Sequence, residues 1–137
     1  MSGLTPPIGR NSKLAVLVLL LTSVATAQTP QPVLDMFRVA ARALADRDVQ
    51  GFLEQFDPAM KDYEELRRRA ALLVAVEGAE SSIEVVSDEG DNQRRLMQID
   101  WLLRVGTGAP KRRVLSFTVE RRERAWKITA LDPVNFF

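Results

Sequence analysis

The chain has 137 residues, of which 46% are hydrophobic and 27% charged, and its 19 basic side chains nearly balance 18 acidic ones. This composition is typical of a single globular domain and excludes a disordered, collagen-like or low-complexity chain. The chain has no Cys and no His. Disulfide scaffolds, Cys/His zinc sites, thiol nucleophiles and imidazole proton shuttles are therefore excluded, and we expect neither a metal nor a cofactor.

The first 27 residues have the features of a secretory leader. Arg10 and Lys13 precede an apolar run from Leu14 to Val24, and Ala25-Thr26-Ala27 supplies the small residues that signal peptidase recognises. The run is about half of the ~20 residues that a membrane-spanning helix needs. We therefore predict a signal peptide at 1–27, cleavage near Ala27, and export of residues 28–137 to the periplasm or the medium. The alternative is a leader that is retained as a membrane anchor.

The predicted mature chain has a charge close to zero. Removing the two basic residues of the leader leaves 17 basic against 18 acidic side chains. The basic clusters at 67–69, 94–95, 111–113 and 121–122 are interleaved with acidic residues. Export and this charge pattern exclude nucleic acid as a partner and favour solvated surfaces. We expect no stable membrane span after the leader.

An amphipathic helix and a short second helix are predicted at the start of the mature chain. Residues 28–32 contain two prolines and are expected to be extended. From Val33, apolar residues recur at helical spacing as far as residues 46–48. Asp48 can then cap a short second helix that carries Phe52.

A third predicted helix begins at Asp57-Pro58, where an N-cap acid precedes a proline at the first helical position. It runs to about Glu77 and ends at Gly78. Its expected buried stripe consists of Met60, Tyr63, Leu66, Ala70 and Leu73.

After Gly78 the apolar period changes to two, which predicts β-strands. Four alternating segments follow, at 83–85, 97–105, 115–119 and 126–130. The short connections between them predict an antiparallel meander with one apolar face. The predicted fold class is α+β, with three N-terminal helices packed on a curved four-stranded antiparallel sheet.

This order of parts resembles the NTF2-like (SnoaL-like, cystatin-like α+β) superfamily. The resemblance rests on residues 43–48 and 52–58 at the helix junctions and on the closing segment 126–133, and it extends over the predicted mature chain. It implies a cone formed by the helices and the bent sheet around a pocket, and subunits that pair through their sheets. Members of the superfamily include isomerases, dehydratases and transport factors, so the fold alone does not indicate which function a member has.

Large apolar side chains on the inner sheet face are the candidates for lining such a pocket: Met97, Trp101, Leu103, Phe117 and Trp126. They either fill the core or, where helices and sheet separate, surround a small apolar ligand. Tyr63 is either a core aromatic residue or a hydrogen-bond donor to a ligand carbonyl in that pocket.

Asp100 interrupts the most apolar strand and falls by parity on the outer face, where solvent or a dimer interface is expected. As a general base it would have to face the cavity with a raised pKa. Members of the superfamily similar to ketosteroid isomerase use carboxylates and a Tyr, whereas dehydratase-like members use a His–Asp pair that this chain cannot form. No residue matches a catalytic motif closely enough to receive a role.

These observations favour an exported, non-enzymatic binding or assembly module that forms a homodimer through its sheet, where Leu96 and Leu102 lie among polar outer residues. One alternative is an isomerase or lyase of the ketosteroid-isomerase-like kind that uses Tyr63 and a carboxylate. A carboxylate within hydrogen-bonding reach of Tyr63 inside a pocket would favour that alternative. Another is a purely structural envelope protein without a ligand pocket. Phe136 and Phe137 are expected to dock against the helices, because exposed aromatic residues promote aggregation.

Overall fold

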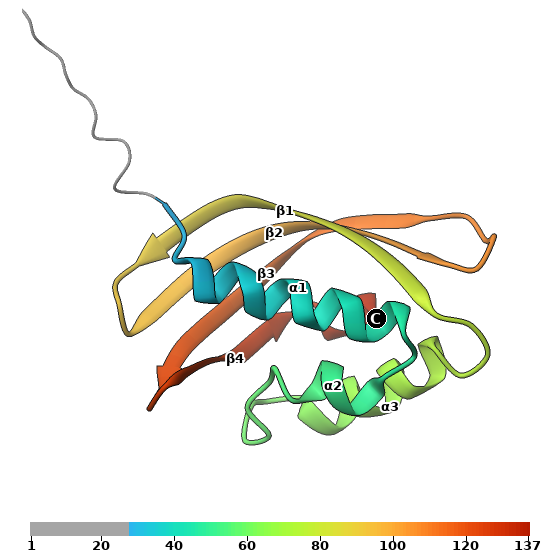
Figure 1. The fold of residues 1–137 in the computed structure, drawn as a ribbon, viewed down its shortest axis with the longest axis horizontal. Helices are drawn as coiled ribbons and strands as arrows, with labels where there is room; N and C mark the ends of the chain where they lie inside the picture. Colours follow the sequence, from blue (N-terminus) through green and yellow to red (C-terminus); the bar gives the residue numbers. More distant parts are fainter. Residues whose placement is uncertain (1–27) are drawn as a thin grey trace, which may run out of the picture.

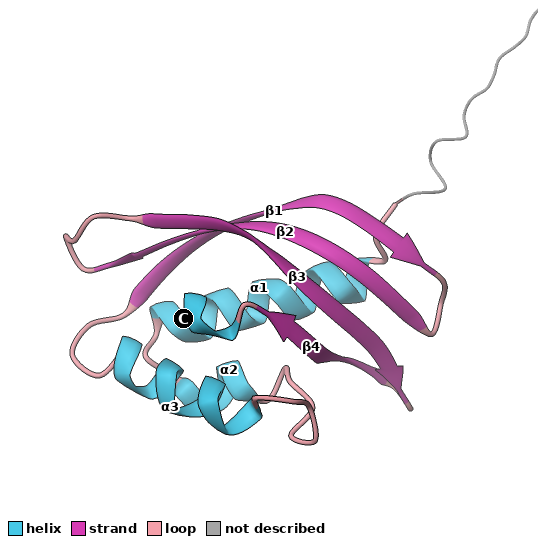
Figure 2. Cartoon of the chain, turned by 180° about the vertical axis from the view of Figure 1, so that it is seen from behind, coloured by secondary structure: helices cyan, strands magenta, loops and turns pink. Residues whose placement is uncertain are grey.

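The fold is a helical layer on one face of a single antiparallel sheet. The computed structural model describes residues 28–137, so the predicted signal peptide lies outside the described residues. The sheet has the order β1-β2-β3-β4, as the meander prediction required. α1 lies along its inner face, with α2 and α3 beside α1 (Figure 1), and the strands curve over the helices when seen from behind (Figure 2). The elements are α1 (Gln31–Ala45), α2 (Val49–Leu53), α3 (Tyr63–Leu73), β1 (Ala79–Gly90), β2 (Arg94–Val105), β3 (Lys111–Arg122), β4 (Ala125–Asp132) and η4, a short 3-10 helix (Val134–Phe136).

The first two helices confirm the prediction, with one shift. α1 begins at Gln31 rather than Val33, because Pro32 lies in the first turn, where its missing N–H removes no helical hydrogen bond. Asp48 caps α2, and its carboxylate accepts a hydrogen bond of 2.9 Å from the N–H of Gly51. Within residues 28–137 no helix is long and apolar enough to cross a membrane.

The predicted start of the third helix is wrong. α3 begins at Tyr63, and residues 57–62 form turns instead. The carboxylate of Asp57 accepts a hydrogen bond of 2.8 Å from the N–H of Ala59, and the N–H of Asp57 donates to the carbonyl of Ile128 at 2.8 Å. A hydrogen bond to β4 therefore fixes the backbone of Asp57 in this turn, although the Asp57-Pro58 sequence predicts the start of a helix.

The predicted end of the third helix is also wrong, because α3 ends at Leu73 rather than at Glu77. The guanidinium of Arg47 donates hydrogen bonds to the carbonyls of Val74, at 2.9 Å, and of Ala75. It thereby satisfies carbonyl groups that a longer helix would have bonded internally.

The sheet is bent by two bulges. In β1 the register with β2 shifts between Val85 and Ser87, and in β4 the pairing with β3 skips Thr129. Bulges increase the local bend and twist of a strand. Beyond β4 the sheet is continued by an isolated parallel bridge between Phe56 and Ile128, which covers part of that edge.

The core lies between the helices and the inner face of the sheet. The period-two prediction is confirmed, because alternate residues of β2 from Met97 to Leu103 are each 1% exposed. Phe37 of α1 meets Phe117 of β3 edge-on at 5.0 Å between ring centroids. Phe136 and Phe137 are buried as well, which confirms that they dock into the fold.

Candidate functional site

The inner sheet face is packed as core. Met97, Trp101, Leu103 and Phe117 are each at most 2% exposed, and Trp126 is half-buried against them. Met97 and Phe117 border a hollow of about 680 Å³, whereas Trp101, Leu103 and Trp126 border neither this hollow nor three others on residues 28–137. Of the two interpretations of these side chains, the geometry favours core packing over an open pocket.

Tyr63 lies beside carboxylates but does not use them. It borders a hollow of about 490 Å³ together with Asp57 and Glu54. The Asp57 carboxylate is paired with Arg122 at 3.0 Å, and the ammonium group of Lys127 donates to the backbone carbonyl of Glu54. Among the described residues, no hydrogen bond joins the Tyr63 hydroxyl to either carboxylate. The Tyr–carboxylate pair that the enzyme alternative needs is therefore not formed.

Asp100 lies on the outer face, and Arg112 of β3 holds its carboxylate in a bidentate ion pair. Nε of Arg112 lies 3.0 Å from Oδ1 and Nη2 lies 2.6 Å from Oδ2. These hydrogen bonds hold the pKa of Asp100 below its usual range. A general base near neutral pH needs the opposite shift, so Asp100 fits an ion-paired surface role.

The outer face of the sheet is hollowed. A hollow of about 680 Å³ extends across all four strands and reaches Lys61 and Asp62 in the loop before α3. The buried side chains of Met97, Phe117 and Leu131 border it, together with outward-facing side chains of all four strands. The outward-facing side chains are Ser87, Glu89, Leu96, Gln98, Ser116, Thr118, Ala130 and Asp132.

Apolar side chains are exposed on the same face. Leu96 is 49% exposed, Val114 44% and Leu102 37%. Leu102 and Val114 are diagonal neighbours on β2 and β3, because Asp100 is the register partner of Val114. We call Leu96, Gln98, Leu102, Val114 and Ser116 the outer patch.

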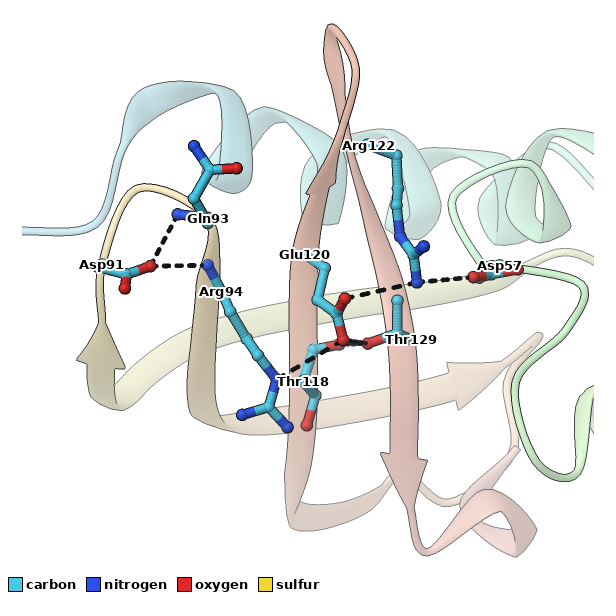
Figure 3. Close-up of polar contacts among 8 residues, drawn as sticks. All are labelled: Asp57, Asp91, Gln93, Arg94, Thr118, Glu120, Arg122 and Thr129. Carbon is cyan, nitrogen blue, oxygen red and sulfur yellow. Dashed lines mark hydrogen bonds and ion pairs between the residues drawn. The ribbon is translucent and has the colours of Figure 1, made fainter.

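A chain of polar contacts borders one end of the outer patch (Figure 3). Glu120 is at its centre: Oε1 lies 3.4 Å from Arg122 and Oε2 lies 3.6 Å from Arg94. The hydroxyl of Thr129, the bulged residue of β4, donates to Glu120 at 3.0 Å. Arg122 continues the chain to Asp57. Exposed pairs of this kind contribute little stability each, but together they restrict the positions of several long side chains.

The other end of this chain lies in the turn between β1 and β2. Asp91 accepts backbone hydrogen bonds from Gln93 at 2.8 Å and from Arg94 at 3.0 Å. These two bonds lower the pKa of Asp91. The turn that carries Arg94 is thus fixed by its own aspartate, and Arg94 extends from it toward Glu120 (Figure 3).

The sequence identified part of this site. Parity placed Leu96, Leu102 and Asp100 on the outer face, and the structure confirms this. Val114 was missed, although its alternation with Leu115 carries the same signal. Lys61 and its loop could not be placed, because their sequence predicts a helix.

The outer face presents side chains for packing and hydrogen bonding. Residues 28–137 contain no cluster of three or more Asp and Glu side chains arranged to hold a metal ion. The carboxylates of Asp100 and Glu120 are paired with arginines. Exposed aliphatic side chains, an amide and hydroxyls instead form a surface suited to packing and hydrogen bonding.

The chain matches no family profile and no curated protein by sequence. In structure it is similar to an NTF-2 like protein of unknown function from Shewanella oneidensis, with a TM-score of 0.65 at 11% identity over 74% of this chain and 94% of that one. A domain of unknown function with a cystatin-like fold from Nostoc punctiforme gives 0.60 at 17% identity over 80% and 76%. A protein of the NTF2-like family from Streptomyces avermitilis, provisionally described as a dehydratase, gives 0.59 at 13% identity over 74% and 91%.

These similarities define the class of fold. The chain has the NTF2-like, cystatin-like α+β fold, as the resemblance of its sequence implied. At such low identities they show the fold alone and assign no activity.

Proposed function

We propose that the chain is an exported, non-enzymatic binding or assembly module, and that two copies pair through the outer patch. The observation that carries this proposal is the contrast between the two sheet faces. The inner face is filled by core side chains, whereas the outer face exposes Leu96, Leu102 and Val114, of which Leu96 borders the hollow of about 680 Å³. Exposed apolar residues grouped within a polar rim are characteristic of protein interfaces.

The middle of the outer patch supports pairing with a second sheet. Gln98 on β2 donates a hydrogen bond of 3.1 Å to the hydroxyl of Ser116 on β3. No charge lies on this neutral polar pair, so it can be desolvated at lower cost than an ion pair. Leu96 lies beyond it toward one end of the strands, and Val114, Leu102 and the Asp100–Arg112 ion pair lie toward the other. A sheet-on-sheet contact places such a surface at its centre.

Export is proposed from the predicted leader, and one contact of the folded domain lies close to the predicted cleavage position. The hydroxyl of Thr29 donates to the Asp88 carboxylate at 2.5 Å, and Asp88 is paired with Arg95 at 2.8 Å. The folded domain thus includes Thr29, two residues after the predicted cleavage position at Ala27. Cleavage after Ala27 would retain Thr29 and its hydrogen bond to Asp88.

The experiment measures molar mass by light scattering on residues 28–137 over a micromolar dilution series. We expect a mass of two chains that dissociates on dilution. Leu96→Lys with Leu102→Lys should give a single chain, because two charges would be buried in the interface. The control is Leu72→Lys, at a residue of α3 that is 71% exposed and lies away from the sheet. A mass of one chain for the unaltered protein at every concentration would overturn the pairing.

A further inference from the structure

β1 forms one edge of the sheet, and its backbone is open on the side away from β2. The strand pairs with β2 alone, whereas the opposite edge at β4 carries the bridge from Phe56. In an antiparallel pair, alternate residues of a strand turn their N–H and C=O groups away from the partner strand. Among residues 28–137, no other backbone segment pairs with these groups of β1. Figures 1 and 2 both show β1 at the rim of the sheet, with α1 beneath it.

The open stretch of β1 is regular and ends at a defined position. Residues 79–85 pair with β2 without a shift of register, and the bulge at Val86 ends this stretch. Beyond the bulge, the Thr29 hydroxyl donates to the Asp88 carboxylate at 2.5 Å, so the segment before α1 lies against that end of the strand. An added strand would therefore pair with residues 79–85.

A groove separates this edge from α1. It contains a hollow of about 80 Å³ that is bordered by Leu34 and Arg38 of α1 and by Ile83 and Val85 of β1. Ile83 and Val85 face the helices but stay partly exposed, whereas Ile99, the register partner of Val85 on β2, is 1% exposed. The difference arises because β1 has no neighbouring strand on its other side. Aliphatic side chains of an added strand would cover these groups, since alternate residues of such a strand face α1.

The outward-facing side chains of the same stretch are acidic. Glu80 and Glu84 are exposed, with Ser82 between them. Neither glutamate forms an ion pair within the described part of the chain. Opposite charges on facing residues of neighbouring strands stabilise a sheet, and like charges destabilise it. Basic side chains of an added strand are therefore favoured beside Glu80 and Glu84.

We propose that the β1 edge binds an extended peptide in which aliphatic and basic side chains alternate. The peptide main chain pairs with residues 79–85, its aliphatic side chains face α1, and its basic side chains lie beside Glu80 and Glu84. A second copy of this chain fits less well. Antiparallel pairing of two such stretches about Ser82 would place Glu80 of one copy opposite Glu84 of the other. The proposal gives the binding module a peptide partner at a site apart from the outer patch, so peptide binding and sheet pairing can fail independently.

The first measurement follows the fluorescence anisotropy of a labelled heptapeptide of sequence VKVTVKV as purified residues 28–137 are added. This sequence is a palindrome, so either strand direction places its lysines beside Glu80 and Glu84. We expect saturable binding that Glu80→Lys with Glu84→Lys weakens about ten-fold, because both attractions become repulsions. The charge-reversed peptide VEVTVEV should bind this variant more tightly than it binds the unaltered chain.

The matched control is Glu64→Lys with Glu123→Lys, which changes the net charge equally at two exposed residues outside β1. This control should bind VKVTVKV almost as tightly as the unaltered chain does. Equal losses in the two double variants would overturn the proposal, because the peptide would then respond only to net charge. Absence of binding to the unaltered chain would overturn it as well.

The second measurement separates strand addition from charge attraction. Hydrogen exchange of the backbone amides of residues 79–85 is followed by NMR with and without saturating VKVTVKV. We expect every second amide, those that face away from β2, to exchange at least about ten-fold more slowly in the complex. The amides between them, which already bond to β2, should change little. Protection that is absent from the outward amides would overturn the proposal, even if the peptide binds.

Discussion

Arg112 and Asp100 form a two-pronged ion pair across β2 and β3, with Nη2 of the arginine 2.6 Å from Oδ2 of the carboxylate. The Asp100 side chain is 16% exposed, whereas that of Arg112 is 66% exposed. The aspartate is therefore covered by its own partner. The arrangement keeps a carboxylate ionised on the outer face beside Leu102 and Val114.

Replacing Arg112 should raise the pKa of Asp100. The hydrogen bonds from Arg112 stabilise the ionised carboxylate in the folded chain and so lower its pKa below the unfolded value. The pair consequently favours folding above the unfolded pKa of about 3.9 and loses that effect as the pH falls through the folded pKa. A 13C NMR titration of the carboxyl carbon should show a higher midpoint in Arg112→Gln. Arg113→Gln is the control, and an unchanged midpoint in Arg112→Gln would contradict the assignment.

The buried pair of Asp88 and Arg95 should be the most sensitive charged site of the domain. Their side chains are 3% and 8% exposed. Asp88→Ala leaves the guanidinium buried without its counter-charge and should lower the free energy of unfolding by about 3–5 kcal/mol in urea titrations. Replacing both residues, with Asp88→Leu and Arg95→Met, should lower the free energy of unfolding by clearly less than Asp88→Ala does. A double variant as unstable as the single one would contradict this explanation.

Gly78 should not tolerate a side chain. A Cβ atom at this position would overlap the backbone carbonyl of Ala45 at the end of α1. We expect Gly78→Ala to lower the unfolding free energy by about 1–3 kcal/mol, because neither backbone can move freely. Gly108→Ala is the matched control, since its Cβ would lie 3.2 Å from the carbonyl of Val105 in an exposed turn. Equal losses in thermal unfolding would show that the close approach is not the cause.

Ser81 should contribute more to the free energy of unfolding than its exposed neighbour Ser82. Its hydroxyl accepts the hydrogen bond from the indole N–H of Trp101, which is 1% exposed. Ser81→Ala leaves that N–H unpaired and should cost about 1–3 kcal/mol. Ser82→Ala, at the next and exposed position, should change little. Chemical denaturation of both variants tests this, and a neutral Ser81→Ala would mean that the indole finds another partner.

Local sequence signals predicted the fold wherever they agreed with tertiary contacts. Period two separated inner from outer residues along β2, because each side chain is either buried or solvated there. The prediction that Asp48 caps a helix was also confirmed, because its carboxylate bonds the N–H of Gly51, only three residues away. Asp57 carries the same kind of signal but donates its backbone N–H to Ile128, which is distant in the sequence. A pattern of neighbouring residues cannot predict a hydrogen bond to a residue that is distant in the sequence.

The candidate site was less accessible to sequence reasoning for the same reason. Parity assigned Asp100 to the outer face, but its partner Arg112 is set by the register between two strands. The hollow is bordered by residues next to the bulges at Val86 and Thr129 and by the loop at Lys61. Those features arise from how strands and loops fit together, so alternation alone could not predict them.

The pairing of two outer faces can be tested most directly by the accessibility of a single thiol. Ser116→Cys places that thiol in the outer patch, and Ala71→Cys places a control on the exposed side of α3. We expect alkylation at Ser116→Cys to slow markedly as the protein concentration rises from nanomolar to high micromolar, while the rate at Ala71→Cys stays constant. Rates that are independent of concentration at both positions would contradict a buried outer face.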